Sequence, residues 1–99
     1  MEYTYRAEIV ANQSVQDVIT ELLEEKIENI EYTVIPGVMG KGRHSKKLGN
    51  TIWPELNFIL FVYTDKEGAD KITEIIKTVQ NRYPKEGISL FLVPGFSER

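Results

Sequence analysis

Four short apolar runs alternate with two longer amphipathic patterns along this chain, and their order leaves few folds open. The runs lie at residues 3–11, 30–38, 57–64 and 88–93, and each is rich in the β-branched and aromatic residues that favour strands. After the first and the third run, apolar residues recur every three or four positions, as in a helix with one buried side. The predicted order is strand, helix, strand, strand, helix, strand. This is the ferredoxin-like βαββαβ arrangement of the α+β class, an antiparallel sheet with two helices on one face.

The two helical patterns carry start and stop signals of their own. Ser14 with Asp17, and Thr64 with Glu67, have the spacing of a capping box at a helix start. Asn29 and Pro84 are expected to end the two helices. The apolar positions expected to face the core are Val15, Val18, Ile19, Leu22, Leu23 and Ile27 in the first helix, and Ala69, Ile72, Ile75, Ile76, Val79 and Tyr83 in the second.

The strand runs also make a prediction about the face of the sheet that the helices leave uncovered. That face should show polar residues at alternate positions, and Thr4, Arg6 and Glu8 follow this rule in the first run. The segments 58–62 and 90–93 are apolar throughout, so they place apolar side chains on the uncovered face as well. We expect a homo-oligomer whose sheets face inward. The open alternatives are a monomer with an exposed apolar face and an unidentified hetero-partner.

The segment between the second and third runs is long, basic and rich in glycine. Residues 37–55 read GVMGKGRHSKKLGNTIWPE, and positions 32–54 contain no acidic residue. In a compact domain, a structureless connection longer than about 12–15 residues is usually functional or disordered. The whole chain has a net charge of −3, so nucleic acid is not an expected partner. The loop alone suits an anion or an acidic protein surface.

The composition of the chain limits the classes of protein to which it can belong. The chain has no cysteine, so neither a disulfide framework nor a thiolate metal site is expected. It shows neither an apolar stretch of about 18 residues nor a signal-peptide pattern, so we expect a cytoplasmic protein without membrane insertion. Its 99 residues are expected to form one domain, 1–99. No acid, base and nucleophile are grouped, so no enzymatic activity and no catalytic residue are expected.

Several residues of the loop have both a functional and a structural interpretation. The run Gly40-Lys41-Gly42-Arg43 could wrap an anion, because glycine lets successive backbone N–H groups point inward; alternatively, its glycines supply only flexibility. His44 could bind a metal only with ligands from elsewhere in the fold, and it could equally be an exposed loop residue. Trp53 could stack on a ligand or partner, although packing against its own sheet or the next subunit is favoured.

The element order, the basic loop and the inward-facing sheets resemble the PII signal-transduction superfamily over nearly the whole chain. The stretch GVMGKGRHSKK occupies the place of that family's T-loop, here the segment 37–56, with Met39 in place of an aromatic residue. The family's second phosphate loop is replaced by the shorter segment 83–87, which has one glycine. The resemblance implies a homotrimer that binds an anionic effector, such as an adenine nucleotide, in the clefts between subunits. It also implies that the loop contacts a target protein.

Under this resemblance the loop residues divide into two sets. The expected effector contacts are Gly37, Gly40, Lys41, Gly42, Arg43 and Lys47. The expected contacts to a target protein are His44, Lys46 and Trp53.

A sister family, the CutA divalent-cation tolerance proteins, is also similar. The segments 22–26 and 34–38, and the pair Tyr83-Pro84, carry this likeness, whereas the cysteine and the paired tryptophans of that family are missing. This second resemblance implies an alternative function, a divalent-metal-binding trimer in which His44 and carboxylates bind copper or zinc.

Overall fold

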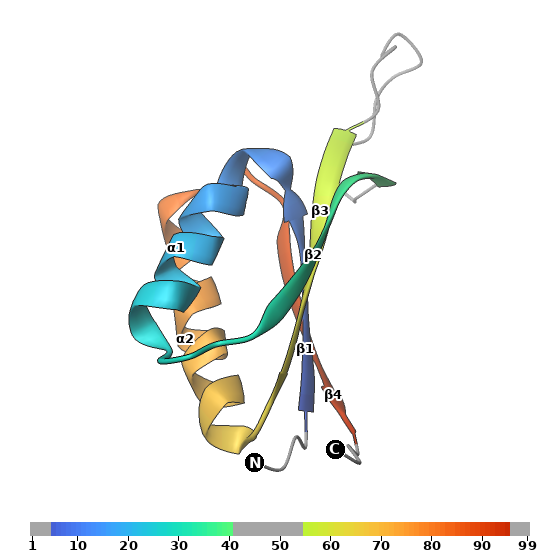
Figure 1. The fold of residues 1–99 in the computed structure, drawn as a ribbon. Coiled ribbons are helices and arrows are strands. Elements are labelled where there is room, and N and C mark those ends of the chain that lie inside the picture. The colour runs from blue at the N-terminus through green and yellow to red at the C-terminus, as the bar shows by residue number, and fades with distance from the viewer. Residues whose placement is uncertain (1–4, 41–54, 96–99) are drawn as a thin grey trace, which may run out of the picture.

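The chain forms a four-stranded antiparallel sheet with two helices packed on one face (Figure 1). The computed structural model describes residues 5–40 and 55–95. The predicted βαββαβ order and the α+β class are confirmed, and the strand order across the sheet is β2-β3-β1-β4. In chain order the elements are β1 Tyr5–Asn12, a short 3₁₀ helix η1 Gln13–Val15, α1 Gln16–Lys26, β2 Tyr32–Gly40, β3 Glu55–Thr64, α2 Lys66–Arg82 and β4 Ile88–Pro94.

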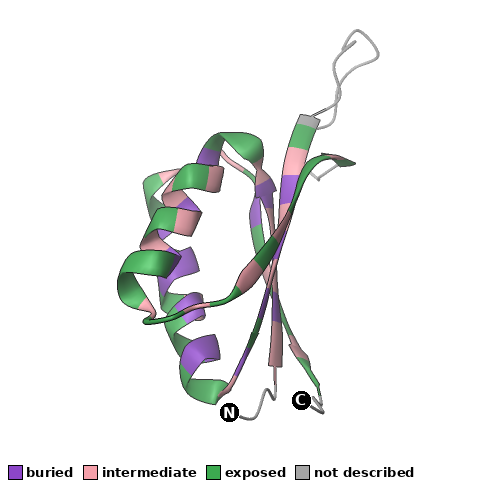
Figure 2. Ribbon diagram, viewed as in Figure 1, coloured by how far each residue is buried: buried purple, intermediate pink, exposed green. Residues whose placement is uncertain are grey.

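The core lies between the helices and the sheet (Figure 2). Successive side chains of a strand point to opposite faces, so alternate residues meet the helices. The register places Ile9 of β1 opposite Leu60 of β3 and Leu90 of β4 on this side. The predicted core positions of both helices are confirmed as buried or partly buried. The largest fully buried side chains are Phe58, Ile9, Ile19, Leu23, Leu60, Ile72, Ile76, Val15, Val62 and Val79.

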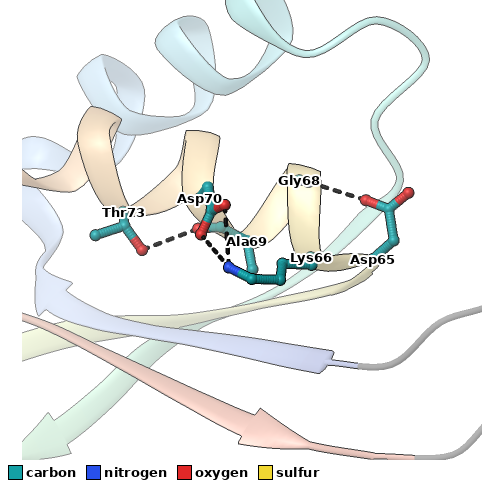
Figure 3. A network of polar contacts seen from close by, with 6 residues as sticks. All are labelled: Asp65, Lys66, Gly68, Ala69, Asp70 and Thr73. Atoms are coloured by element: carbon teal, nitrogen blue, oxygen red, sulfur yellow. Dashed lines mark hydrogen bonds and ion pairs between the residues drawn. The ribbon is translucent and has the colours of Figure 1, made fainter.

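Both predicted capping boxes are wrong, because Asn12 caps η1 and Asp65 caps α2, while Val15 at the N-cap of α1 makes no side-chain capping bond. At the first helix, Asn12 Oδ1 accepts a hydrogen bond from the Ser14 backbone N–H at 2.9 Å, and the turn of η1 precedes α1. At α2 the cap is Asp65, whose Oδ1 accepts from the Gly68 backbone N–H at 2.9 Å (Figure 3). Thr64 is the last residue of β3 and its side chain is buried, so it is not free to cap. A carboxylate at a helix N-terminus also interacts favourably with the helix dipole.

Other side chains hold the first turns of α2 (Figure 3). Lys66 Nζ lies 3.3 Å from both carboxylate oxygens of Asp70, and Thr73 Oγ1 donates to the Ala69 carbonyl oxygen at 2.9 Å. An exposed ion pair of this kind contributes at most about 1 kcal/mol to stability. The cap and the close packing of Gly68 are therefore the stronger determinants of where α2 begins.

Gly68→Ala is expected to lower the free energy of unfolding by about 1–3 kcal/mol, the usual cost of overpacking. A Cβ at this position would collide with Oγ1 of Thr64, a buried and stiff β-branched side chain. Replacing glycine by alanine inside a helix ordinarily stabilises it by about 0.5–1 kcal/mol, so the sign of the effect is diagnostic. Urea denaturation followed by circular dichroism measures it. Gly87→Ala is the matched control, since a Cβ there meets nothing within 4 Å; equal losses in the two variants would contradict the clash.

The boundaries of the predicted loop differ from the structure. Strand β2 continues past Pro36 and Gly37 to Gly40, and β3 begins at Glu55. Pro36 and Gly37 distort the strand: the pairing register shifts between Ile35 and Val38, and Gly37 has φ 66°. An edge strand tolerates proline, since one side of its backbone is unpaired. Residues 37–40 of the predicted loop therefore belong to a strand.

The end of α1 is joined to β2 by a contact between Tyr32 and Glu24. Burial raises the pKa of the Tyr32 phenol, and the nearby Glu24 carboxylate raises this pKa further by its charge and by accepting a hydrogen bond. A raised pKa means that the folded state holds the proton more tightly than the unfolded state does. The resulting stabilisation is complete below about pH 10 and is lost as the pH rises above that value.

Candidate functional site

The predicted ligand loop begins and ends at one end of the sheet, where β2 and β3 form a hairpin. Met39 pairs with Leu56 and Gly40 pairs with Glu55, so the strands remain paired up to the last described residue on each side. Figure 1 shows that this end of β3 reaches beyond the helices. The fold therefore brings the two ends of the loop together, at a place that the helical layer does not cover. We call the residues Val38–Gly40 and Glu55–Asn57 the hairpin end.

Two of the predicted effector contacts fall within the described residues. Gly37 occupies the irregular step of β2 in a left-handed conformation that other residues rarely adopt. Gly40 ends β2, and a Cβ on it would collide with the side-chain amide nitrogen of Asn57, so glycine permits this close approach. The remaining predicted residues lie outside the described ranges: Lys41, Gly42, Arg43 and Lys47 for the effector, and His44, Lys46 and Trp53 for the target.

Two apolar side chains beside the loop were missed by the sequence analysis. Met39 is 72% exposed and Leu56 is 47% exposed, and the two residues are paired across the hairpin. Leu56 lies two residues before the buried Phe58, so its side chain points to the same face of the sheet as Phe58. Met39 is paired with Leu56 and therefore points to that face as well. Further along the sheet, the helices cover this face. Met39 and Leu56 are exposed because the helical layer does not extend as far as the hairpin end. Strand alternation could have indicated their face, but it carries no signal for where the helical layer stops.

A second candidate surface is the face of the sheet opposite the helices, which we call the open face. Its residues follow from the register, because Arg6, Glu8 and Val10 alternate with the core residues of β1. The predicted apolar character of this face is confirmed: Tyr63 is 52% exposed and Phe91 is 54% exposed. The apolar and aromatic residues of the open face are Val10, Ile35, Ile59, Phe61, Tyr63, Phe91 and Val93.

A shallow groove lies between the two helices on the outer side of the helical layer. Its volume is about 520 Å³, and Leu22 of α1 and Ile75 of α2 supply its apolar lining. The charged lining residues are of both signs, so the groove does not favour an anion or a cation. They are Lys26, Asp70, Lys71 and Glu74.

The metal alternative depends on residues that the structure does not describe. Within residues 5–40 and 55–95, no group of three or more His, Cys, Asp or Glu side chains is placed to hold a metal ion. His44, the predicted ligand, lies outside these ranges. The alternative remains a prediction from the sequence.

No helix in the described part of the chain is both long and apolar enough to cross a membrane.

Comparison with known proteins gives a clear result for the fold. No family model matches the chain, and none of the curated proteins matches it. Among solved structures, CPII from Thiomonas intermedia K12, a nitrogen regulatory PII-like protein bound to ADP, AMP and bicarbonate, aligns with a TM-score of 0.73. The alignment covers 100% of this chain and 98% of that chain, at 17% sequence identity. The chain has a PII-like fold.

Two further structures share the PII-like fold. A candidate PII-like signalling protein from Thermus thermophilus aligns with a TM-score of 0.66 and 17% identity, over 95% of this chain and 88% of that chain. The apo form of CPII aligns with a TM-score of 0.63 and 12% identity, over 99% of this chain and 98% of that chain. The agreement in fold at such low identity rests on the arrangement of strands and helices, since few side chains are shared.

Proposed function

We propose that this chain is a PII-like regulatory protein that binds an anionic effector, an adenine nucleotide or bicarbonate, and contacts a target protein through the segment 37–56. The likeness of fold over the whole chain supports this proposal, because the CPII structures contain ADP, AMP and bicarbonate. In the proposal the chain is a single domain, acts in the cytoplasm and catalyses no reaction. The effector would favour one loop conformation through contacts that other conformations lack.

The observation that carries the proposal is the exposed apolar pair at the hairpin end, which is followed along the sequence by a basic segment. Met39 and Leu56 expose an apolar surface there, and the loop that starts at Lys41 supplies four basic residues with no acidic residue among them. An adenine nucleotide has a flat apolar base and anionic phosphates, so its chemistry matches both the apolar pair and the basic segment. Bicarbonate matches the basic part alone. A nucleotide is therefore the favoured effector.

The proposal also includes self-association through the open face. Burying the water-exposed aromatic residues of that face against another protein surface is favourable. A second copy of the chain offers such a surface with the same apolar character. The PII-like resemblance implies a homotrimer. In a homotrimer with inward open faces, the hairpin end of one copy would lie beside its neighbour, and the effector would bind in the cleft between them.

Titration calorimetry tests the effector. ADP, AMP and bicarbonate are each titrated into the wild-type chain, and ADP is expected to release or absorb measurable heat. Arg43→Ala is expected to weaken ADP binding by about 10- to 100-fold, the loss of one hydrogen bond to a charged group. Lys77→Ala is the matched control, because Lys77 is exposed on α2, away from the hairpin end, and forms an ion pair with Glu74 at 3.8 Å. The absence of heat with all of these ligands would refute the effector proposal.

A further inference from the structure

An ion pair lies in the middle of the apolar open face. Arg6 Nη2 is 2.7 Å from Glu8 Oε2, and both residues belong to β1, which has strands on either side. The register places Glu8 between Phe61 of β3 and Phe91 of β4. The Arg6 guanidinium carbon lies 5.9 Å from the centre of the Phe61 ring, within the range of a cation–π contact. Opposite charges are thus held beside aromatic rings on a surface where most neighbouring residues are apolar.

The hydrogen bonding of this pair is incomplete in a single copy. The Arg6 side chain is 41% exposed and that of Glu8 is 24% exposed, so water reaches both charged groups. The Arg6 Nε atom is buried and has no hydrogen-bond partner among residues 5–40 and 55–95. A guanidinium has five N–H donors and a carboxylate accepts several hydrogen bonds, so each group can bind a further partner besides the one it has.

The chemistry of the pair restricts what can cover the open face. A wholly apolar partner would strip water from both charges and replace it with nothing, which is costly. A second copy of the chain brings its own Arg6 and Glu8 to the same surface. The acid of one copy can then accept from the arginine of the next, while the aromatic residues pack around them. The open face is therefore complementary to itself in charge as well as in apolar character.

We propose that Arg6 and Glu8 form an ion-pair network between copies of this chain, and that this network makes self-association selective over other apolar partners. The inference rests on the self-association in the proposed function and adds the residues that determine its specificity. Polar groups inside an apolar interface contribute little net affinity, yet they penalise every arrangement that leaves them unpaired. Arg6 and Glu8 would thus fix which surfaces meet and in what alignment.

Charge reversal tests the network. Arg6→Glu gives each copy two acids on the open face, and Glu8→Arg gives each copy two bases. Each variant alone is expected to self-associate at least about 100-fold more weakly than wild type, because like charges meet across the interface. An equimolar mixture of the two variants is expected to associate more tightly than either variant alone, since acidic faces meet basic ones. It is expected to associate less tightly than wild type, because a trimer of two kinds of copy must join two like faces at one contact. The double variant R6E/E8R is expected to recover affinity to within about tenfold of wild type. Sedimentation equilibrium measures all of these species.

The controls separate this inference from the proposed effector binding. Lys77→Glu changes the same charge on the outer side of α2 and is expected to associate like wild type. The inference is overturned if the single reversals associate like wild type, if their mixture associates no more tightly than either variant alone, or if wild type is monomeric. Calorimetry with ADP on the same preparations is a separate readout. Complementation without ADP binding would support the network and refute only the effector.

Discussion

Phe91→Asp is expected to leave the chain folded and to weaken its self-association by at least about 100-fold. Phe91 is 54% exposed in a single copy, so a carboxylate there is solvated and costs the monomer little. In the associated state the same carboxylate would be buried opposite Glu8, with which Phe91 is paired across β1 and β4. An uncompensated charge in an interface costs several kcal/mol, and each 1.4 kcal/mol is about tenfold in affinity. Sedimentation equilibrium over a concentration series measures the change.

The adjacent residue of the same strand provides the matched control. Leu92 is 40% exposed, a value close to that of Phe91, but it pairs with the buried Ala7 and so belongs to the opposite face of the sheet. Leu92→Asp adds the same charge a single position along the chain. It is expected to associate like wild type, with circular dichroism confirming that both variants are folded. If wild type and Phe91→Asp associated equally, the open face would not be part of the interface.

The Phe91→Asp variant tests the location of the effector site as well as self-association. A ligand cleft between subunits exists only if the copies associate, so Phe91→Asp should also weaken ADP binding although the hairpin end lies elsewhere on the chain. Undiminished ADP binding by a monomeric Phe91→Asp variant would place the whole effector site within a single copy. The proposal of a shared cleft would then be wrong, while the regulatory function could stand.

The order of the elements could be predicted because it depends on local periodicity. Residues such as Ile72, Ile76 and Val79 recur at helical spacing, and segment 58–62 is an uninterrupted apolar run, so type and order are visible in the sequence. The open face followed from the same pattern, since a strand that is apolar at every position must expose some of its side chains. Both predictions are confirmed by the register and the burial of these residues.

The ends of the elements could not be predicted in the same way. Thr64 and Asp65 can both cap a helix, and the choice between them depends on which side chain the core has already buried. Ser14 does not cap α1, because η1, which is capped by Asn12, forms a tighter turn before that helix and leaves Val15 at its N-cap. These choices are made by tertiary packing, which a short stretch of sequence does not encode.

The candidate site was predicted in part for similar reasons. The loop was identified by its charge and its glycines, and Gly37 and Gly40 do occupy special backbone positions. Met39 and Leu56 were missed because their exposure depends on where the helices stop. The contact of Arg6 with Phe61 depends on side-chain placement across neighbouring strands, for which the sequence offers no marker.

Phe58→Ala is expected to lower the free energy of unfolding by about 3–5 kcal/mol, the usual loss when a buried phenylalanine is truncated. Phe58 is fully buried, and it pairs with Ala11 of β1, a small neighbour that cannot fill the cavity. A single domain is typically stable by about 5–15 kcal/mol, so the variant would approach the threshold of folding. Association would add stability and mask part of the loss, so urea denaturation is best measured in the monomeric Phe91→Asp background.

Two companion variants decide whether the loss reports the helix-covered core. Phe61→Ala removes the same ring from the same strand but from the open face, and in the monomeric background it is expected to cost no more than about 1 kcal/mol. Phe58→Leu keeps most of the volume and is expected to cost about 1–1.5 kcal/mol, so it remains measurable even if Phe58→Ala does not fold. If Phe61→Ala lost more free energy of unfolding than Phe58→Ala, the assignment of the covered and the open face would be wrong. The apolar open face would then be the core, and its role in self-association would have no physical basis.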